Sequence, residues 1–384
     1  MADTGITDPR IELFAELVDK VRNNSHLAEA ETVSVDTGIY VDDAHLAREK
    51  ATIFSDVPLI IGHASMIPEP GDHFTHDHLA KPMLVVRGKD GQVRVFLNAC
   101  RHRGVRLANN TGVERRKQFT CPYHHWSYDL DGSLKSVPLE ESLPDLDKGC
   151  RGLISLPAEV RHGFIWVVPN PDGRLDLDDW LGDMNRDFEK FDVAGQFYFA
   201  HSTKRKKTNW KLIVDAFLDG YHVARLHRKS IGPMFLDSVS AANQSGPHIR
   251  SLVARSEFPE AMEMSPGQWS FSDHVTMAYQ IFPNTTLIFH PDYLSILTVY
   301  PVAADETIVQ HICLIPDPIR DEKEQAHWER AFDIIENRVF EAEDFFVCEQ
   351  AQIGLNAGVQ PDFLLGGYEV GIAMYHRELA ARLA

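Results

Sequence analysis

The stretch "NACRHRG" (residues 98–104) contains Cys100-x-His102, and "TCPYHHW" (residues 120–126) contains Cys121-x-x-His124. Eighteen residues separate the two pairs, and both stretches lie in a segment of short β-rich runs broken by glycine and proline. Thiolate and imidazole ligands select zinc or an iron–sulfur cluster among the common metal groups. Structural zinc sites usually pair cysteine with cysteine and histidine with histidine, whereas each stretch here supplies one of each. This spacing favours a two-iron cluster held by two thiolates and two imidazoles, with a zinc site as the alternative.

A second group of candidate ligands lies in "TNWKLIVDAFLDGYHVARLHRKS" (residues 208–230), which carries Asp219, His222 and His227. Asp219 and His222 are three residues apart and share a helix face. His222 and His227 are five residues apart, about 140° around an ideal helix. The two histidines can therefore meet one metal ion only if the expected helix bends or ends between them.

A third ligand is expected in "AEDFFVCEQAQIGL" (residues 342–355), where Asp344 lies on an apolar helical stripe. An aspartate in such a position is costly unless it is paired or binds a metal. Glu343 is the competing carboxylate. Two histidines and one carboxylate leave open positions on ferrous iron and suit a non-heme oxygenase. For each of these residues taken alone, the alternative to metal binding is a purely structural role.

The first pair of stretches resembles a Rieske [2Fe–2S] motif, through "CRHRG", "CPYH", Trp126 and "YDLDGSL" (residues 128–134). The resemblance implies that Cys100 and Cys121 bind one cluster iron, and His102 and His124 the other. His125 stands where members of the family usually carry glycine or another small residue. That departure leaves open which of the two adjacent histidines binds, with the spacing in favour of His124.

The later segments resemble the catalytic domain of Rieske non-heme iron oxygenases, the α (catalytic) subunits of the aromatic ring-hydroxylating dioxygenase family. "NWK" (209–211), "DGYH" (219–222), the spaced histidine and the late "ED…Q.GL" carry the resemblance, which covers about residues 55–380. It implies an α+β chain, with an N-terminal β-rich Rieske domain and a C-terminal helix-grip catalytic domain built on an antiparallel sheet.

The same resemblance assigns roles to the second group of ligands. It implies that His222, His227 and Asp344 bind the mononuclear iron. Asp219 matches the family's bridging carboxylate, which hydrogen-bonds a histidine of the mononuclear site and reaches a Rieske-ligand histidine of the neighbouring subunit. Such α subunits form head-to-tail homotrimers (α3), alone or with a β subunit (α3β3).

The implied activity is that of an oxygenase component with one Rieske [2Fe–2S] cluster and one mononuclear Fe(II). Electrons from NAD(P)H arrive from a separate reductase, directly or through a ferredoxin, because the sequence has no GxGxxG fingerprint and no flavin motif. O2 is activated to hydroxylate an aromatic or other apolar substrate, with one or two oxygen atoms transferred. The alternative is a monooxygenase that performs N- or O-demethylation, for example of a quaternary amine. Some family members that act on quaternary amines use glutamate where this chain has Asp219, so the aspartate points away from them. The alternative from a different class of protein is a Rieske electron carrier without catalytic activity.

The apolar side chains of residues 231–300 are expected to supply much of the substrate pocket, with ordinary core packing as the alternative. They are Met234, Phe235, Phe258, Met262, Met264, Trp269, Phe271, Phe282, Phe289 and Tyr293. His290 is a further candidate for the pocket. Arg250 and Arg255 could bind a carboxylate of the substrate, and the alternative for each is an exposed strand position.

Periodicity places helices and strands along the whole chain. Helices are expected at 10–32, 43–54, 178–190, 208–228 and 319–356 and at the C-terminus, with a hairpin turn at "GKDGQ" (88–92) and sequential antiparallel strands at 274–282, 285–290, 293–302 and 306–315. Three domains are predicted: an N-terminal helical segment that packs on the catalytic domain (1–54), the Rieske domain (55–172) and the mononuclear iron catalytic domain (173–384).

Composition excludes several other classes of protein. The 384 residues carry a formal net charge of −18, which argues against phosphate-dependent nucleic-acid binding and against adsorption to an anionic membrane. No apolar run approaches a membrane span, and the polar first ten residues contain no apolar core of a secretory signal. Five cysteines are too few for a disulfide framework. These features predict a cytoplasmic location.

Overall fold

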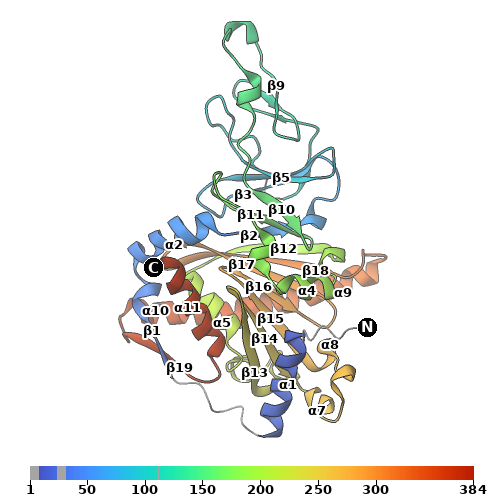
Figure 1. The fold of residues 1–384 in the computed structure, drawn as a ribbon, viewed down its shortest axis with the longest axis vertical. Helices are drawn as coiled ribbons and strands as arrows, with labels where there is room; N and C mark the ends of the chain where they lie inside the picture. Colours follow the sequence, from blue (N-terminus) through green and yellow to red (C-terminus); the bar gives the residue numbers. More distant parts are fainter. Residues whose placement is uncertain (1–7, 24–31, 111) are drawn as a thin grey trace. The chain divides into compact units, whose positions relative to one another are not determined.

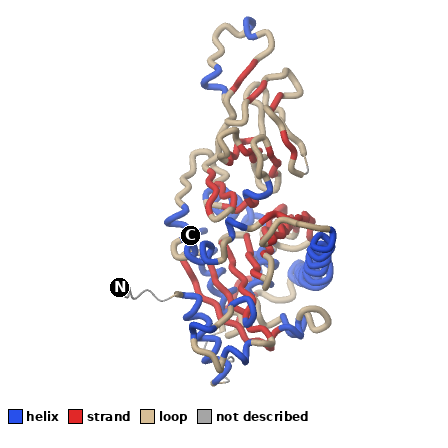
Figure 2. Tube along the Cα trace, turned by 90° about the vertical axis from the view of Figure 1, so that its right-hand side faces the viewer, coloured by secondary structure: helices blue, strands red, loops and turns tan. Residues whose placement is uncertain are grey.

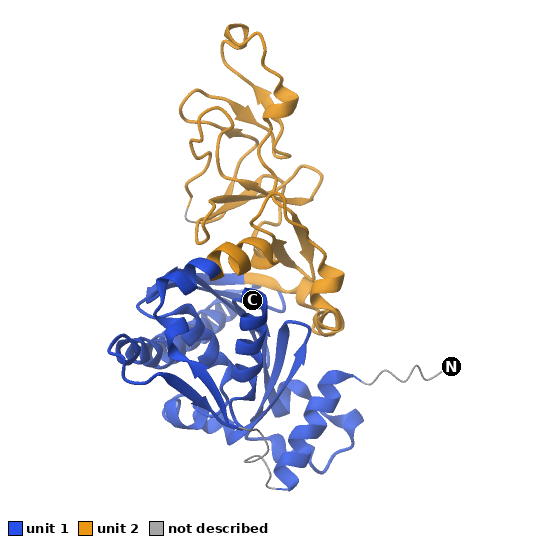
Figure 3. Cartoon of the chain, turned by 60° about the vertical axis from the view of Figure 1, so that its left-hand side comes forward, with its two compact units in different colours: residues 1–48, 199–384 blue, residues 49–198 orange. Residues whose placement is uncertain are grey.

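The computed structural model describes residues 8–23, 32–110 and 112–384, and the contacts divide the chain into two units (Figure 3). Unit 1 comprises residues 1–48 and 199–384, and unit 2 comprises residues 49–198. Within the described ranges, no helix combines the length and the apolar character needed to cross a membrane. The domain boundaries at 54/55 and 172/173 stay predictions from the sequence.

Unit 1 is built on a seven-stranded sheet in the order β12-β18-β17-β16-β15-β14-β13 (Figure 1). The pairs from β13 to β18 are antiparallel, so the predicted antiparallel sheet and the α+β class are confirmed. The strands are β12 (Phe197–Lys206), β13 (Phe235–Ser245), β14 (His248–Arg255), β15 (Val275–Ile281), β16 (Thr285–Phe289), β17 (Leu294–Ala303) and β18 (Glu306–Ile315). A separate two-stranded sheet pairs β1 (Val33–Asp36) with β19 (Asp362–Leu365).

Helix α5 (Trp210–Leu218) lies against this sheet, where it contacts β15 and β17. Its first turn is capped by Asn209, whose side chain accepts a hydrogen bond from the backbone N–H of Lys211. Most of its residues are apolar and buried, which anchors the helix on the sheet. The helix ends where Asp219 adopts an extended backbone conformation (φ −98°, ψ 110°). This end fixes the start of the loop that carries the candidate metal ligands.

The remaining helices of unit 1 surround the sheet. They are α1 (Pro9–Arg22), α6 (Val223–Leu226), α7 (Phe258–Ala261), α8 (Phe271–His274), α9 (Glu322–Asp333), the π-helix η8 (Ile334–Phe345), α10 (Phe346–Asn356) and α11 (Val370–Leu383), while α2 (Asp43–Asp56) runs across the boundary between the units. Helix α1 packs on β13 and β14, and its Phe14 stacks on Trp269 with 4.5 Å between the ring centroids. Consecutive helices α9, η8 and α10 form one continuous helical stretch.

Unit 2 consists of three small sheets joined by long loops (Figure 2). They contain β10-β11-β2, β5-β4-β3-β6 and β7-β8-β9 in these orders. The elements are β2 (Leu59–His63), β3 (Asp72–His76), β4 (Met83–Arg87), β5 (Val93–Leu97), β6 (Glu114–Arg115), β7 (Phe119–Thr120), β8 (Ser127–Tyr128), β9 (Leu134–Ser136), β10 (Ala158–Arg161), β11 (Phe164–Val167), α3 (Leu177–Leu181) and α4 (Met184–Lys190). The expected hairpin turn at 88–92 joins β4 to β5, which pair antiparallel.

Several expected elements differ from the structure. The helix expected at 208–228 is interrupted, because α5 ends at Leu218 and α6 begins only at Val223. The helix expected at 10–32 ends at Arg22, and residues 24–31 of that prediction lie outside the described residues. The long strands β13 and β14 were not predicted, since "FLDSVSAANQS" (235–245) mixes polar and apolar residues without a clear alternation.

Candidate metal centres and active site

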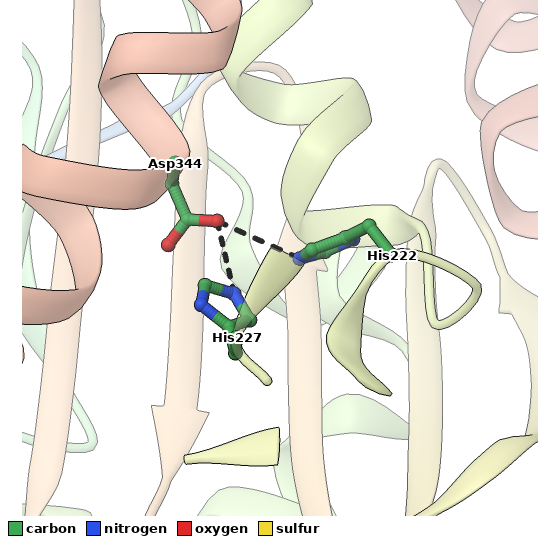
Figure 4. A group of neighbouring side chains, drawn as sticks. All are labelled: His222, His227 and Asp344. Carbon is green, nitrogen blue, oxygen red and sulfur yellow. Dashed lines mark ion pairs between the residues drawn. The ribbon is translucent and has the colours of Figure 1, made fainter. Parts of the chain in front are cut away.

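Three predicted ligands meet in unit 1, in the interruption between α5 and the long helical stretch. His222 precedes the short helix α6 and His227 follows it, while Asp344 projects from η8 toward both rings (Figure 4). Asp344 Oδ1 lies 3.2 Å from His227 Nε2 and 3.5 Å from His222 Nε2. One ligand atom from each residue lies within 4.8 Å of the others. The helix break therefore removes the 140° separation that an unbroken helix would impose on the two histidines.

The charges of this group are strongly coupled. Burial disfavours the imidazolium of His222, but the carboxylates of Asp219 and Asp344 outweigh burial and raise its pKa to about 9. Burial also opposes the charge of His227, whose pKa is raised because Asp344 and Glu343 lie beside it. Burial would raise the pKa of Asp344, yet the two histidines hold it below its ordinary value. The three side chains form a site that favours positive charge, which a metal ion can supply in place of protons.

Glu343 has a different position from its neighbour Asp344. Its Oε2 lies 2.7 Å from Nδ1 of His227 and accepts a hydrogen bond from Ser230 Oγ at 2.5 Å. An ionised carboxylate can only accept, so Nδ1 of His227 carries the proton and Nε2 is left free on the side of Asp344. This contact orients the ring as outer carboxylates do for metal-binding histidines. Sequence reasoning named Glu343 only as a competing ligand, because its partner lies more than a hundred residues away.

Asp219 occupies the corresponding place beside His222. Its Oδ2 lies 3.4 Å from His222 Nδ1, and its Oδ1 accepts a hydrogen bond from the backbone N–H of Tyr221. Gly220 packs closely in the same turn, where a Cβ atom would lie 2.8 Å from Ser240 Oγ. The turn between α5 and α6 therefore requires glycine at 220, and this fixes the two neighbouring ligand-bearing positions.

The donor set fits a mononuclear iron. Two imidazole nitrogens and one carboxylate oxygen on one side of a site are the ligands of the two-histidine, one-carboxylate ferrous centre. Nδ1 of His227 is engaged by Glu343, and Nδ1 of His222 faces Asp219, so the Nε2 atoms are the ones available to an ion. Bound ferrous iron at such a site supplies open positions for O2.

A cavity of about 580 Å³ adjoins the three ligands. Its lining is mostly apolar and comes from α5, the loop after His227, strands β14 to β16, and the helices α9 and η8. Of the predicted pocket residues, Met234, Phe235, Tyr293 and His290 line it. Ile231 also lines it, at the start of the predicted range 231–300, whereas the lining residues that sequence reasoning missed include Phe217, Val223, Ile335, Val339 and Phe340. Their helical periodicity in the sequence gives no sign of which face meets a ligand.

Other predicted pocket residues do not line the cavity and pack elsewhere in unit 1. Phe258, Trp269 and Phe271 pack around Phe14 of α1, and Phe282 and Phe289 pack against Tyr375 and Tyr279. Neither arginine is exposed: Arg250 is buried away from the cavity, whereas Arg255 lines it.

A run of four basic residues, Lys204 to Lys207, pairs with Glu306, Glu336 and Glu341 of unit 1.

The four predicted cluster ligands lie in two loops of unit 2. Cys100 and Cys121 are both buried in one apolar cluster, together with Phe119, Trp126 and Tyr128. The rings of His102 and His124 lie 4.6 Å apart, and His102 stacks on Trp126 at 4.8 Å with an interplanar angle of 5°. Tyr128 holds the first loop: its hydroxyl oxygen lies 3.3 Å from Cys100 Sγ and accepts a hydrogen bond from the backbone N–H of Arg101.

Unsatisfied polar atoms in these loops fit a metal cluster. Nδ1 of His102 and Nδ1 of His124 are both buried and have no hydrogen-bond partner among the described residues. Burial raises the pKa of the Cys100 thiol, so a thiolate there needs a positive charge beside it. Buried polar groups without partners are rare and require an explanation. Iron ions would supply both the charge and the missing partners.

His125 differs from His124 in its backbone and its exposure. It adopts φ +58°, in the left-handed region that glycine tolerates best, and its side chain is exposed. The backbone conformation accounts for the preference for a small residue at this position. The ring of His124, by contrast, faces the ring of His102.

A second cavity, of about 650 Å³, is lined from α5, α10, α11 and β19. Asp219 and Ala216 line both cavities, so the carboxylate of Asp219 stands between them. Exposed apolar side chains lie on α10, on β19 and in the loop between them: Phe346, Ile353, Val359 and Leu364. Leu364 also lines the second cavity, and the other three lie on or between elements that contribute to its lining.

Family models match both parts of the chain. A Rieske [2Fe-2S] domain model matches residues 58–147, and a model of the ring hydroxylating alpha subunit (catalytic domain) matches residues 178–384. Biphenyl 2,3-dioxygenase subunit alpha of Rhodococcus jostii is 35% identical over 52% of this chain, but the match covers only 44% of that subunit. The carnitine monooxygenase oxygenase subunit of Acinetobacter baumannii is 26% identical over 83% of this chain and 84% of its own length.

Solved structures agree on the fold. A quaternary ammonium Rieske monooxygenase in complex with L-carnitine has a TM-score of 0.77 at 22% identity, over 91% of this chain and 95% of that one. Naphthalene 1,2-dioxygenase from Rhodococcus sp. has a TM-score of 0.78 at 19% identity, over 98% of both chains. Since the catalytic-domain model covers more than half of the chain and a Rieske model precedes it, the chain belongs to the family of Rieske non-heme iron oxygenase α subunits.

Proposed function

We propose that this chain is the oxygenase component of a monooxygenase that hydroxylates a small molecule with an apolar body. The observation that carries the proposal is the meeting of His222, His227 and Asp344 at the wall of an apolar cavity of about 580 Å³. Hydroxylation of a carbon attached to nitrogen or oxygen leads to dealkylation, so N- or O-demethylation, including that of a quaternary amine, falls within the proposed reaction.

The protein groups have separate tasks in this proposal. Cys100, Cys121, His102 and His124 hold the [2Fe–2S] cluster, and His222, His227 and Asp344 hold the mononuclear iron. When bound, these groups supply single electrons and the reduction of O2. Glu343 and Asp219 orient the two metal-binding imidazoles, and the apolar lining positions the substrate and excludes water.

Monooxygenation is favoured by the length of the match to carnitine monooxygenase subunits. These relatives align over most of both chains, whereas the aromatic dioxygenase relatives with higher identity align over about half of each. The aromatic rings of Phe217, Phe235 and Tyr293 in the cavity offer faces suited to a quaternary ammonium group.

Dihydroxylation of an aromatic ring is the second candidate. The mostly apolar lining suits a hydrocarbon, and the biphenyl and chlorobenzene dioxygenase subunits are 35% and 33% identical over the parts that align. Asp219 also favours this candidate, because some of the family's quaternary-amine enzymes carry glutamate at this position. The two candidates share the same ligands and differ in the number of oxygen atoms transferred.

Electron supply and assembly complete the proposal. A separate NAD(P)H reductase, with or without a ferredoxin, delivers the electrons, and the chain works as a homotrimer in which Asp219 faces the Rieske histidines of a neighbouring subunit. The position of Asp219 between two cavities, beside an apolar surface, supports this arrangement.

A single turnover under 18O2 tests the proposal. Chemically reduced, iron-loaded protein is offered aromatic hydrocarbons, aromatic acids and methylated amines, and the products are identified by mass spectrometry. One labelled oxygen in the product, or release of a methyl group as formaldehyde, supports a monooxygenase, and two labelled oxygens support the dioxygenase. Iron analysis separates the non-catalytic carrier: roughly three irons per chain are expected for an oxygenase and two for a carrier.

A further inference from the structure

Arg255 is the one lysine or arginine among the described residues that line the catalytic cavity. It is the last residue of β14, where Ser251, Val253 and Arg255 alternate along the strand and all line the cavity. Its side chain is only 13% exposed. A guanidinium thus stands in a mostly apolar cavity, where a charge without a close partner is costly.

The protein supplies this guanidinium with little compensation. Within the described residues, its nearest carboxylate oxygen is Glu257 Oε2 at 3.9 Å, and the side chain of Glu257 is about half exposed. Nε of Arg255 is buried and makes no hydrogen bond. The ring of Phe235 contributes a cation–π contact at 5.9 Å from Cζ. Buried donors are normally satisfied, so this guanidinium is poorly compensated by the described residues. Nε itself is closed off, so a ligand in the cavity would meet the Nη1 and Nη2 atoms.

The other polar groups around the cavity do not substitute for Arg255. Burial lowers the pKa of His290 to about 3, so this ring is neutral, and it stacks on Tyr293 with 4.0 Å between the ring centroids. Asp292 has a side chain that is 55% exposed to solvent. The acidic groups Asp219 and Asp344 face the histidines. Arg255 is therefore the single fixed positive charge that a substrate meets away from the metal ligands.

The sheet sets the distance between this charge and the metal ligands. Val253, two residues before Arg255, lies beside Gly220, which is itself two residues before His222. Two residues along a strand correspond to roughly 7 Å. Arg255 and the three candidate metal ligands line the same cavity, so one substrate can contact the guanidinium with one end and lie beside the ligands with the other.

We propose that Arg255 binds a carboxylate of the substrate, so that this oxygenase selects molecules with a single carboxylate whose apolar body extends toward His222, His227 and Asp344. A guanidinium binds a carboxylate through two parallel N–H···O bonds, and one guanidinium balances one negative charge. This substrate class rests on the proposed function, because it takes the cavity beside the metal ligands as the substrate site.

Calorimetric binding to the iron-loaded protein without O2 tests the proposal. The probes are matched pairs: benzoate and benzyl alcohol, 4-phenylbutyrate and 4-phenylbutanol, γ-butyrobetaine and butyltrimethylammonium. In the best-binding pair, the acid is expected to bind at least about tenfold more tightly than its partner without the carboxylate. Arg255→Gln should remove this preference and leave the Kd of the partner compound within about twofold.

Two further variants provide controls. Glu257→Gln removes the nearest carboxylate and should keep the preference for the acid. Arg255→Lys keeps the positive charge but not the planar guanidinium, so it should keep only part of the preference for the acid. The iron content and thermal midpoint of each variant establish that it is folded. If Arg255→Gln does not fold, Arg255→Lys carries the test, with an unchanged preference as the contrary result.

Equal binding of acids and their partners by the native protein, no binding of any acid, or an unchanged preference in Arg255→Gln would overturn the proposal. Its failure can be distinguished from failure of the proposed function. Labelled product from compounds without a carboxylate keeps the oxygenase assignment even when the preference is absent. If the preference for the acid depends on Arg255 but no labelled product forms, the carboxylate-binding site is supported and the oxygenase assignment is contradicted.

Discussion

Two consecutive carboxylates meet the same imidazole from different sides. Asp344 faces Nε2 of His227, and Glu343 faces its Nδ1. A metal ion can occupy only the Nε2 side, because the proton on Nδ1 is held by Glu343. The residues that hold a metal and those that orient its ligands can therefore be separated by substitution.

Asp344→Ala is expected to lose the mononuclear iron and to retain the [2Fe–2S] cluster, since the cluster ligands lie in other loops. Glu343→Gln should retain the iron with an affinity lowered by about 10- to 100-fold, because it disturbs only the orientation of His227. Iron analysis together with the visible spectrum measures both outcomes. Full iron content in Asp344→Ala, with loss of iron in Glu343→Gln, would show that Glu343 is the ligand instead.

Asp219→Asn should keep both metal groups and an unchanged cluster spectrum, yet slow the oxidation of the reduced cluster by roughly 100-fold. The reason is that Asp219 contacts His222 at 3.4 Å and is the one carboxylate that lines both cavities. Stopped-flow absorbance with substrate and O2 present measures this rate. Turnover of the Asp219→Asn variant at the native rate would show that Asp219 is not the bridging carboxylate.

At the scale of single residues, the sequence predicts the features that depend on the spacing of neighbouring residues. Cys100-x-His102 and Cys121-x-x-His124 place thiols and imidazoles in two short loops, and the structure brings these loops together. The role of Glu343 and the burial of Arg255 depend on partners far away in the chain. No pattern of neighbouring residues contains that information.

The π-helix η8 is the element that presents Asp344. A π-helix has wider turns than an α-helix, and such segments often occur at functional sites. The wider turn reduces the angle between consecutive residues, which helps both Glu343 and Asp344 to reach one histidine. Periodicity analysis assumes α-helical spacing, so it predicts the helical stretch at 319–356 but not this local change.

Glu336 connects η8 to the sheet through hydrogen bonds with His311 of β18 and Ser202 of β12. Burial would raise its pKa, but hydrogen bonds from His311, Ser202 and Lys204 outweigh burial and lower the pKa to about 2. A depressed carboxyl pKa stabilises the folded state above the unfolded pKa of about 4.5, and this stabilisation is lost as the pH falls toward 2.

Glu336→Gln should therefore lower the free energy of unfolding by roughly 2 kcal/mol at pH 7. The difference in thermal midpoint between the native protein and the variant should stay constant from pH 8 to pH 5 and shrink below pH 4.5. Circular dichroism at several pH values measures it. A difference that persists unchanged at pH 3.5 would contradict the ionic origin of the stabilisation.

The break between α5 and α6 shows why element boundaries were missed. The segment 208–228 contains no proline, and its apolar residues continue with helical spacing into Val223 and Leu226. The helix nevertheless ends at Leu218, because Asp219 is extended and Gly220 packs against Ser240. The contact with β13 decides the boundary, and β13 itself was not predicted.

At the scale of the whole molecule, the fold class and the order of its two parts could be predicted, because both metal motifs occur in sequence order and the long strands β15 to β18 follow one another. Assembly is less accessible to sequence reasoning. The apolar residues on α10, β19 and the loop between them resemble ordinary core residues in the sequence, and only the structure shows them exposed.

Ile353→Glu combined with Leu364→Glu should convert the proposed trimer into monomers, since both apolar side chains are more than 60% exposed, on α10 and β19. Light scattering after size-exclusion chromatography measures the mass. Val160→Glu, at an exposed apolar position on β10, is the matched control and should leave the mass unchanged. An unchanged trimer in the double variant would locate the interface elsewhere.

The candidate ligands of the mononuclear site come from two distant parts of the chain, with His222 and His227 on one side and Asp344 more than a hundred residues later. An ion bound by all three would act as a cross-link that closes a long loop of unit 1. Iron loss should then loosen the turn at 219–230 and η8 together, and leave the sheet intact. Faster hydrogen exchange confined to these two segments after iron removal would reveal a metal site that also serves as a structural clasp.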